Sequence, residues 1–283
     1  MKALKTRYLL MLAMAGAFSL TGCRKEKEEV TPEMTFESAE DNARIESESE
    51  TSQNFIDIES ADPNLRAGLP SQTNNLPACA SRTWDAANST LTINFGPNNC
   101  LCKDGRYRRG ILTATFAGQW RTVGSSVTIK KFNYFVDDNE HFGTRVITFV
   151  NNENGSANYK YHVAVTGAGI NFTDGSSRNW NAQRDIERIA GQGTPPITDD
   201  EYLVTGTSAG TNRRNVGFTT VIGQPLKKVF RQGCFRNFIS GTVTITNSNN
   251  KTMLLNYDPA NNEACDKTAS VTANGKTRII QLR

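Results

Sequence analysis

The stretch that decides the fold of this chain is Ile111-Leu-Thr-Ala-Thr-Phe-Ala-Gly-Gln-Trp120. Leu112, Ala114 and Phe116 occupy every second position, and threonines lie between them. A repeat of two residues puts the apolar side chains on one face of a β-strand and the hydroxyl groups on the other. Strands of this kind are typical of antiparallel sheets, which have one face against a core and one face in water.

The same pattern recurs on both sides of this stretch. Apolar runs bounded by Gly, Asn and Asp return about every 10 residues, which is the spacing of antiparallel sandwiches and barrels. Further strands are expected at 89–95, 127–136, 145–150, 159–165, 202–206, 215–222, 238–246, 252–257 and 277–282, and the segment 177–190 fits either a strand or a short helix.

Two dipeptides, Asn154-Gly155 and Asn274-Gly275, are typical of tight hairpin turns between such strands. We therefore predict an all-β domain at 76–283, built as an antiparallel β-sandwich or meander. A division of this domain into two packed halves near 170–200 stays open at this point.

The N-terminus has the pattern of an exported lipoprotein. Basic residues precede an apolar run at 8–18, which at roughly 11 residues is too short to span a membrane. Leu20-Thr-Gly-Cys23 resembles a bacterial lipobox, in which Cys23 is lipidated and becomes the mature N-terminus. Residues 1–22 are thus expected to be a signal peptide. The alternative is an ordinary secretory signal with a chance cysteine.

A charged patch at 24–29 follows the cysteine directly. A Lys/Glu-rich patch in this place resembles the surface-export signal of Bacteroidota lipoproteins, and no Asp follows Cys23 to retain the chain at the inner membrane. We expect a lipid anchor in the outer membrane, facing the cell surface. A generic charged spacer is the alternative interpretation.

Charge is unevenly distributed along the chain. Residues 24–68 hold 13 acidic and 5 basic residues, a net charge of −8, whereas residues 69–283 hold 24 basic and 15 acidic residues, a net charge of +9. Nucleic acid is not an expected partner of an exported protein. The simplest interpretation is that the acidic leader partly neutralises a basic body, although anionic lipopolysaccharide or an acidic glycan would also fit.

Residues 23–75 are interpreted as this acidic tether and linker. Phe36, Ala39 and Ala43 have the spacing of one helical face, so a helix at 33–60 that docks loosely on the body is possible. A disordered tether fits the composition equally well.

Two stretches near the ends of the body resemble each other. Asn94-Phe-Gly-Pro-Asn-Asn-Cys100 parallels Asn256-Tyr-Asp-Pro-Ala-Asn-Asn-Glu-Ala-Cys265. Each follows an expected strand, contains a Pro-Asn turn and ends at a cysteine. We interpret them as two related strand–turn–cysteine corners.

Each corner also has a cysteine upstream, and export into an oxidising compartment favours disulfides. The internal similarity predicts the pairs Cys79–Cys100 and Cys234–Cys265, with Cys102 free. Cys102 could replace Cys100 in the first pair. A zinc site is not expected, because the cysteine spacing is wrong and no histidine lies nearby.

Groups suited to catalysis are few. The chain has two histidines, and no Gly-x-Ser-x-Gly motif supports a Ser/His/Asp triad. His141 is expected in a turn and His162 on the polar face of a strand. Acidic clusters at 137–140 and 199–201 could serve a carboxylate-dependent hydrolase or bind calcium, but acidic runs are common in turns. We therefore expect no catalytic residue, metal or cofactor.

Tryptophans are the best candidates for a sugar-binding surface. Trp180 is flanked by Arg178 and Asn181, and a mixture of aromatic and amide groups suits glycan hydroxyls. Trp84 and Trp120 are further candidates. Packing in the core is the competing interpretation, because large aromatic side chains supply much of the buried area of a core.

Asn94-Phe-Gly-x-x-Asn-Cys100, followed by Asp104-Gly-Arg-x-Arg-Arg-Gly-Ile111, resembles a group of uncharacterised Bacteroidota lipoproteins. The resemblance covers most of residues 79–283 but rests on turn and cysteine positions, so it implies a fold and a compartment and no catalytic residue. Together these patterns predict a lipid-anchored binding protein or accessory subunit of an outer-membrane complex. A surface glycan-binding module is the second hypothesis, and a hydrolase the third.

Overall fold

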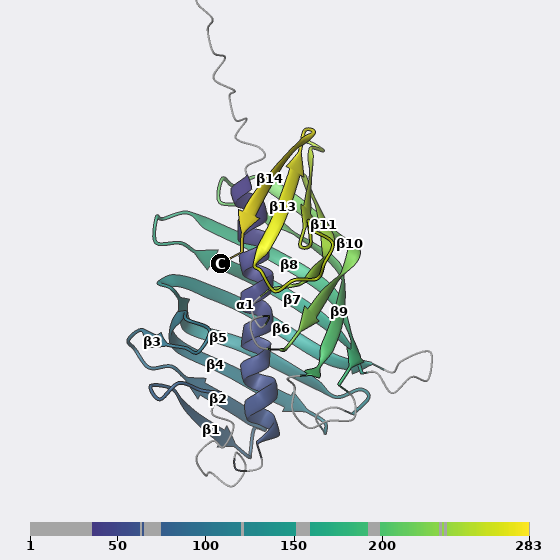
Figure 1. Ribbon diagram of the computed structural model, residues 1–283. Coiled ribbons are helices and arrows are strands. Elements are labelled where there is room, and N and C mark those ends of the chain that lie inside the picture. The colour runs from purple at the N-terminus through teal and green to yellow at the C-terminus, as the bar shows by residue number, and fades with distance from the viewer. Residues whose placement is uncertain are drawn as a thin grey trace, which may run out of the picture. The chain divides into compact units, whose positions relative to one another are not determined.

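Figure 1 shows the computed structural model of the chain, in which the long helix α1 lies against a large antiparallel sheet. The expected signal peptide, Cys23, the patch at 24–29 and the turn expected at Asn154-Gly155 lie outside the described residues. The structure describes residues 36–62, 64, 75–119, 122–150, 159–191, 199–231, 234 and 237–282.

The sheet has 14 strands, each antiparallel to its neighbours, and follows the order of the chain from β1 to β14. Only the short strand β3, which pairs with β4, lies off this path. The strands are β1 (Ser81–Asp85), β2 (Thr90–Asn94), β3 (Cys100–Leu101), β4 (Tyr107–Ala117), β5 (Ser126–Val136), β6 (Asn139–Val150), β7 (Lys160–Asn171), β8 (Ser177–Ala190), β9 (Glu201–Thr211), β10 (Gly217–Val229), β11 (Ser240–Asn247), β12 (Thr252–Asn256), β13 (Thr268–Ala273) and β14 (Lys276–Gln281).

This arrangement confirms the all-β prediction in its meander form. The described strands make one sheet and not the two facing sheets of a sandwich. The sheet is also continuous across 170–200, because β8 pairs with β7 on one side and β9 on the other. The two halves that the sequence left open are therefore not seen. Strands β1, β3 and β13 are too short or too polar to have been predicted.

Alternation of side chains along the strands follows the sequence pattern. In β8, which the sequence left as either strand or helix, buried and exposed residues alternate from Ser177 to Ile186. Arg178, Trp180 and Ala182 point inward, and the residues between them point to solvent. Arginine at inward positions is the feature that separates this sheet from an ordinary apolar one.

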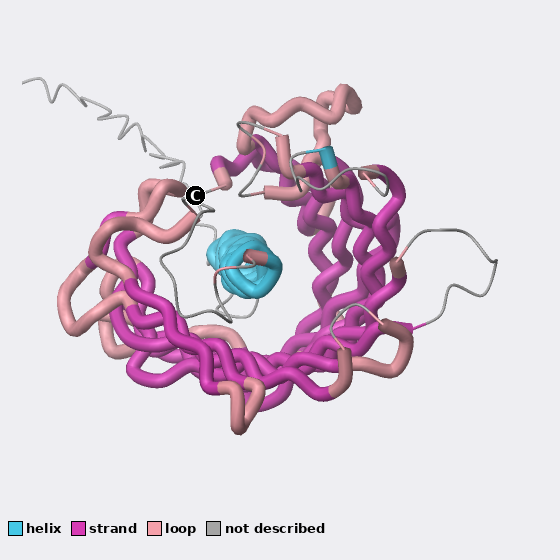
Figure 2. The backbone as a smooth tube through the Cα atoms, turned by 90° about the horizontal axis from the view of Figure 1, so that it is seen from below, coloured by secondary structure: helices cyan, strands magenta, loops and turns pink. Residues whose placement is uncertain are grey.

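The sheet curves strongly, so that it forms an open C around α1 when viewed along the helix (Figure 2). Register shifts help to produce the curvature, because a bulge bends its strand. In β6 the register with β7 shifts between Phe142 and Thr144. Gly143 lies at this shift with φ +114°, and a Cβ there would approach the Cα of Ala168 to 2.4 Å. This position therefore requires glycine.

Helix α1 (Phe36–Ala61) fills the concave side of the sheet. Ala39, Ala43 and Phe55 are buried in the same core as the inward side chains of the strands, and the ring of Phe55 lies 5.5 Å from that of Phe95. The helix considered possible at 33–60 is present as α1. The tether interpretation and the loose docking are wrong for this segment, because its side chains are buried in the core. The reason is that α1 is held largely through its carboxylates, which an apolar periodicity cannot reveal.

Candidate functional site

Acidic residues of α1 pair with arginines from strands β1, β4, β6 and β8 and from the turn between β9 and β10. We call this set the α1 carboxylate–arginine network. Its residues lie in a chain segment that the sequence shows as acidic and a body that it shows as basic, so the network accounts for much of that charge asymmetry. The pairs are Asp41–Arg213, Glu46–Arg184, Glu48–Arg108, Glu50–Arg145 and Glu59–Arg82.

Glu48 is a member of the network whose side chain is almost fully buried. Its carboxylate accepts hydrogen bonds from Arg106 Nη1 at 3.0 Å, from Arg108 Nη2 at 2.8 Å and from the Tyr134 hydroxyl at 3.1 Å. Burial alone would raise the pKa of Glu48, but the guanidinium groups of Arg108 and Arg106 outweigh it and hold the pKa well below its ordinary value of 4.5. Glu48 is therefore ionised at neutral pH.

Cys102 lies beside this cluster but is poorly suited to nucleophilic chemistry. Burial raises the pKa of its thiol, so the protonated form dominates at neutral pH. The thiolate is the nucleophilic form of cysteine, and the side chain of Cys102 is buried. The network around Glu48 holds α1 against the sheet.

Two small cavities lie between α1 and the described strands. One, lined by Glu50, Tyr202 and Lys228, has a volume of about 20 Å³, and a second beside Arg145 has the same volume. Each offers room for about one water molecule. Burial lowers the pKa of Lys228 from 10.5 to about 8, and the rings of Phe230 and Phe238 lie near its ammonium group.

The residues proposed from sequence for glycan binding point to opposite faces of β8. Trp180 is only 7% exposed and Arg178 is buried beside it, whereas Asn181 is exposed on the convex face. Adjacent strand residues point in opposite directions, so these three cannot form one surface. The prediction of a sugar-stacking surface on Trp180 is therefore wrong. Trp84 packs against Phe116 at 5.8 Å, and Trp120 lies outside the described residues.

The two acidic clusters lie at opposite edges of the sheet. Asp138 is in the β5–β6 turn, where Arg109 and Asn99 bind its carboxylate. Asp200 lies between β8 and β9 and accepts a hydrogen bond of 2.6 Å from the Tyr202 hydroxyl. The clusters do not converge on one pocket, as a glycosidase would need. Within the described ranges, no three His, Cys, Asp or Glu side chains are placed to hold a metal ion.

The histidines differ in environment. His162 is exposed on the convex face, as predicted, and its ring nitrogens lie 3.2 Å from Asp185 Oδ1 and 3.0 Å from Gln183 Oε1. His141 was expected in a turn but is buried within β6, where its ring packs edge-on against Tyr134.

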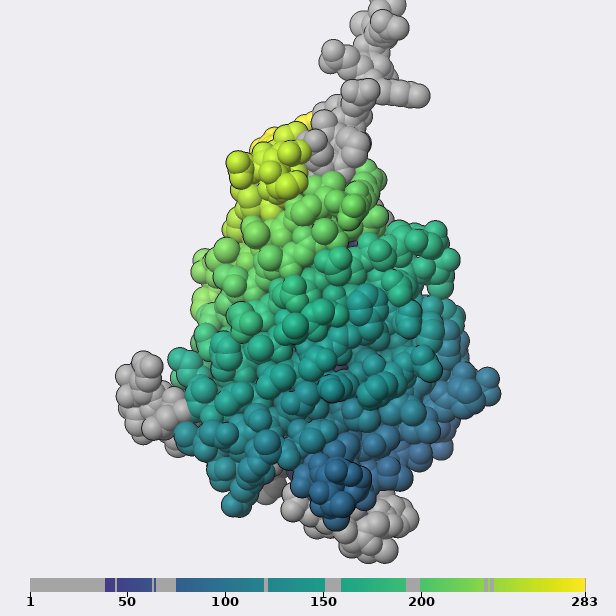
Figure 3. Space-filling model, turned by 180° about the vertical axis from the view of Figure 1, so that it is seen from behind, coloured from purple at the N-terminus to yellow at the C-terminus, as the bar shows by residue number. Residues whose placement is uncertain are grey.

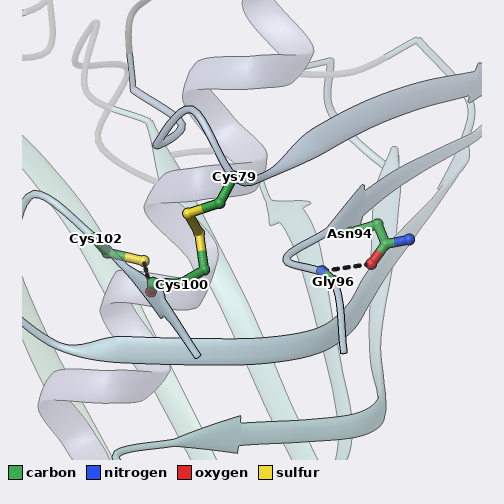
Figure 4. Close-up of a disulfide and its surroundings, with 5 residues drawn as sticks. All are labelled: Cys79, Asn94, Gly96, Cys100 and Cys102. Carbon is green, nitrogen blue, oxygen red and sulfur yellow. Dashed lines mark hydrogen bonds between the residues drawn. A yellow bond between two sulfur atoms is a disulfide. The ribbon is translucent and has the colours of Figure 1, made fainter. Parts of the chain in front are cut away.

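Both predicted disulfides are present, and Cys102 is free. Figure 4 shows Cys79 bonded to Cys100, with the Cys102 thiol directed to the Cys100 carbonyl oxygen at 3.6 Å. The two corners also share a turn. Asn94 Oδ1 accepts from the backbone N–H two residues later at 2.8 Å, and Asn256 Oδ1 does the same at 2.9 Å. The two corners therefore share a disulfide and this turn, although the same turn also occurs elsewhere in the chain, for example at Asp104 and Asn212.

Figure 3 views the convex face of the sheet from behind. On β8–β12 this face carries an area of outward residues without charge. The strand register aligns outward residues of neighbouring strands in rows that cross the sheet. We call two adjacent rows the uncharged convex face. They consist of Gln183, Thr207, Val221, Thr244 and Leu254, and of Asn181, Ala209, Thr219, Thr246 and Thr252.

Comparison of the chain with protein-family models, curated proteins and solved structures gives no match. Among the described residues, no helix combines the length and the apolar character needed to cross a membrane. What the chain does must therefore be argued from its own surfaces.

Sequence reasoning missed both the network and the uncharged convex face. A signal for the network was present in β8, where Arg184 shares the alternation of Trp180, Ala182 and Ile186 and pairs with Glu46 of α1. A buried charge is normally paired, so an arginine in phase with the apolar face of a strand indicates a partner elsewhere in the chain. The acidic leader was the only segment with carboxylates in excess.

Proposed function

We propose that this chain is a lipid-anchored, non-catalytic binding protein of the outer membrane, which acts as an accessory subunit through its uncharged convex face. The anchor is the Cys23 lipobox of the sequence. Support for a binding role comes from the surface chemistry of β8–β12.

The uncharged convex face is the observation that carries this proposal. Charged residues make up 21% of the chain, yet neither row contains one. Val221 and Leu254 are 51% and 42% exposed within it. Depletion of charge together with exposed apolar side chains is typical of the centre of a protein interface. Because the face is convex and the cavities are small, a macromolecular partner fits better than a small molecule.

Pull-down of the native lipoprotein from detergent-solubilised outer membrane tests the binding role. We expect a specific partner to co-purify and to be lost from the double variant Thr207→Arg/Thr219→Arg, which adds charge at exposed positions. The matched control is Thr115→Arg/Ala117→Arg on the same face of β4, which should retain the partner. Loss of the partner from both variants, or no partner with the native protein, would contradict the proposal.

The anchor is tested separately. Mass spectrometry of the mature N-terminus should find an acylated Cys23, and Cys23→Ala should release the protein from membranes. An unmodified N-terminus, or a Cys23→Ala variant that stays membrane-bound unchanged, would rule out the proposed anchor.

A surface glycan is a second candidate ligand. Asn181 and Gln183 present amide groups at successive outward positions of β8, next to the hydroxyl of Thr207. Such groups suit hydrogen bonding to sugar hydroxyls. Binding to a glycan array that Asn181→Ala and Gln183→Ala abolish, with no protein partner recovered, would favour this ligand over a protein subunit.

A further inference from the structure

Three hairpin turns at one edge of the sheet carry basic residues and no acidic ones. They join β9 to β10, β11 to β12 and β13 to β14. The first two are in contact, since the Ser248 N–H donates to the Gly217 carbonyl oxygen at 2.9 Å, and β12 connects the second to the third through the Met253–Ala273 pair. Their cations are Arg213, Arg214, Lys251 and Lys276, and we call these turns the basic edge.

Helix α1 begins at the basic edge. Arg213 Nε and Nη2 each donate a hydrogen bond of 2.7 Å to the carboxylate of Asp41, in the second turn of the helix. Figure 1 shows the start of α1 at the same end of the sheet as the tips of β13 and β14. Arg213 also lies 3.6 Å from Asp174. The other cations of the edge are Arg214 and Lys276, which are exposed, and the half-buried Lys251.

The chain length between the anchor and α1 is short. Cys23 precedes Phe36 by 13 residues, so a fully extended connection reaches at most about 45 Å. This step rests on the proposed function, because it takes Cys23 as the point of lipid attachment. A body held so closely by the N-terminal end of α1 has its basic edge within reach of the membrane surface.

We infer that the basic edge docks on the anionic lipid surface of the membrane that holds the anchor. Phosphate-bearing headgroups complement its cations, and each Lys or Arg near such a surface strengthens binding about fivefold. Docking there would leave the uncharged convex face directed sideways and available to a partner.

Binding of the unlipidated mature chain to vesicles tests this inference. Residues 23–283 with Cys23→Ser would be sedimented at low salt with vesicles of phosphatidylcholine plus phosphatidylglycerol, and with vesicles of phosphatidylcholine alone. We expect binding to the anionic vesicles only, and its loss at high salt. The variant Arg214→Gln/Lys251→Gln/Lys276→Gln should bind on the order of 100-fold more weakly.

The control variant Lys130→Gln/Lys160→Gln/Lys267→Gln removes three cations from other parts of the sheet and should bind as the parent does. Equal weakening of both variants, or no preference for anionic vesicles, would overturn the inference. If the variant Arg214→Gln/Lys251→Gln/Lys276→Gln fails to fold, the lipid preference and the salt dependence of the parent chain still test the inference. Because this chain carries no lipid, failure here leaves acylation of Cys23 and the pull-down unaffected.

Discussion

Glu48 of α1 and Arg108 of β4 form an ion pair with 2.8 Å between Glu48 Oε2 and Arg108 Nη2, and their side chains are 1% and 0% exposed. Removing two charges from water is costly, and the pair is tolerated because further groups complete its hydrogen bonds. Asp104 accepts two hydrogen bonds from Arg108, and Tyr134 binds both partners. The pair thus fixes the helix at one position on the sheet.

Replacing Glu48 with Gln should destabilise the protein strongly. The variant leaves the buried guanidinium of Arg108 with one carboxylate instead of two, and breaking a buried pair from one side costs about 3–5 kcal/mol. Urea denaturation should report the loss as a lower unfolding midpoint. The matched control is Glu40→Gln on the exposed side of α1, which should change the free energy of unfolding by less than about 0.5 kcal/mol. Equal effects of the two substitutions would contradict the role of the pair.

Stability should fall in acid because of Glu48. Its pKa is lower in the folded chain than the ordinary value of 4.5, so its contribution is fully present above pH 4.5 and is lost as the pH falls below that value. Urea midpoints measured between about pH 7 and about pH 3 should therefore decrease, and the decrease should be smaller in Glu48→Gln. A variant with the same slope as the parent would show that other carboxylates cause the acid sensitivity.

Lys228 should make stability depend on pH in the alkaline range. Burial lowers its pKa from 10.5 to about 8, so between these values the unfolded chain binds more protons and stability rises with pH. Lys228→Met should remove this rise and stabilise the protein at neutral pH by up to about 3 kcal/mol. Lys227→Met is the control, since Lys227 lies at the surface and pairs with Glu263. Destabilisation by Lys228→Met would mean that its ammonium group supports the fold.

The five cysteines that follow Cys23 should behave as two disulfide pairs and one buried, slowly reacting thiol. Opening either disulfide by paired Cys→Ser substitution should cost on the order of 3–4 kcal/mol, because the pairs close loops 21 and 31 residues long. An alkylating reagent should label Cys102 slowly in the native protein and rapidly after unfolding. Fast native labelling would show that Cys102 is accessible, and a shuffled disulfide in Cys102→Ser would contradict the pairing.

The sequence was sufficient to predict most of the strands because one face of the sheet is buried and the other meets solvent. In β2, β4 and β11 the apolar residues recur at every second position, and this alternation alone sets strand type and inward face. The disulfide pairs followed from the similarity of the two corners in sequence.

The core itself could not be predicted in the same way. Helix α1 has few apolar residues, and its buried Glu46 and Glu48 are residue types that normally indicate an exposed segment. Their burial depends on arginines more than 50 residues away in sequence, so no local pattern reports it. The uncharged convex face is equally invisible locally, because its rows exist only once the register of five strands is known.

The same long-range pairing limits when α1 can fold against the sheet. Asp41 and Arg213 are 172 positions apart in sequence, so the segment of α1 is synthesised long before this partner. A polar segment of this kind has little helicity alone in water, and folding is slow when contacts are distant. The first turns of α1 can therefore take their final place only after the β9–β10 turn has been synthesised.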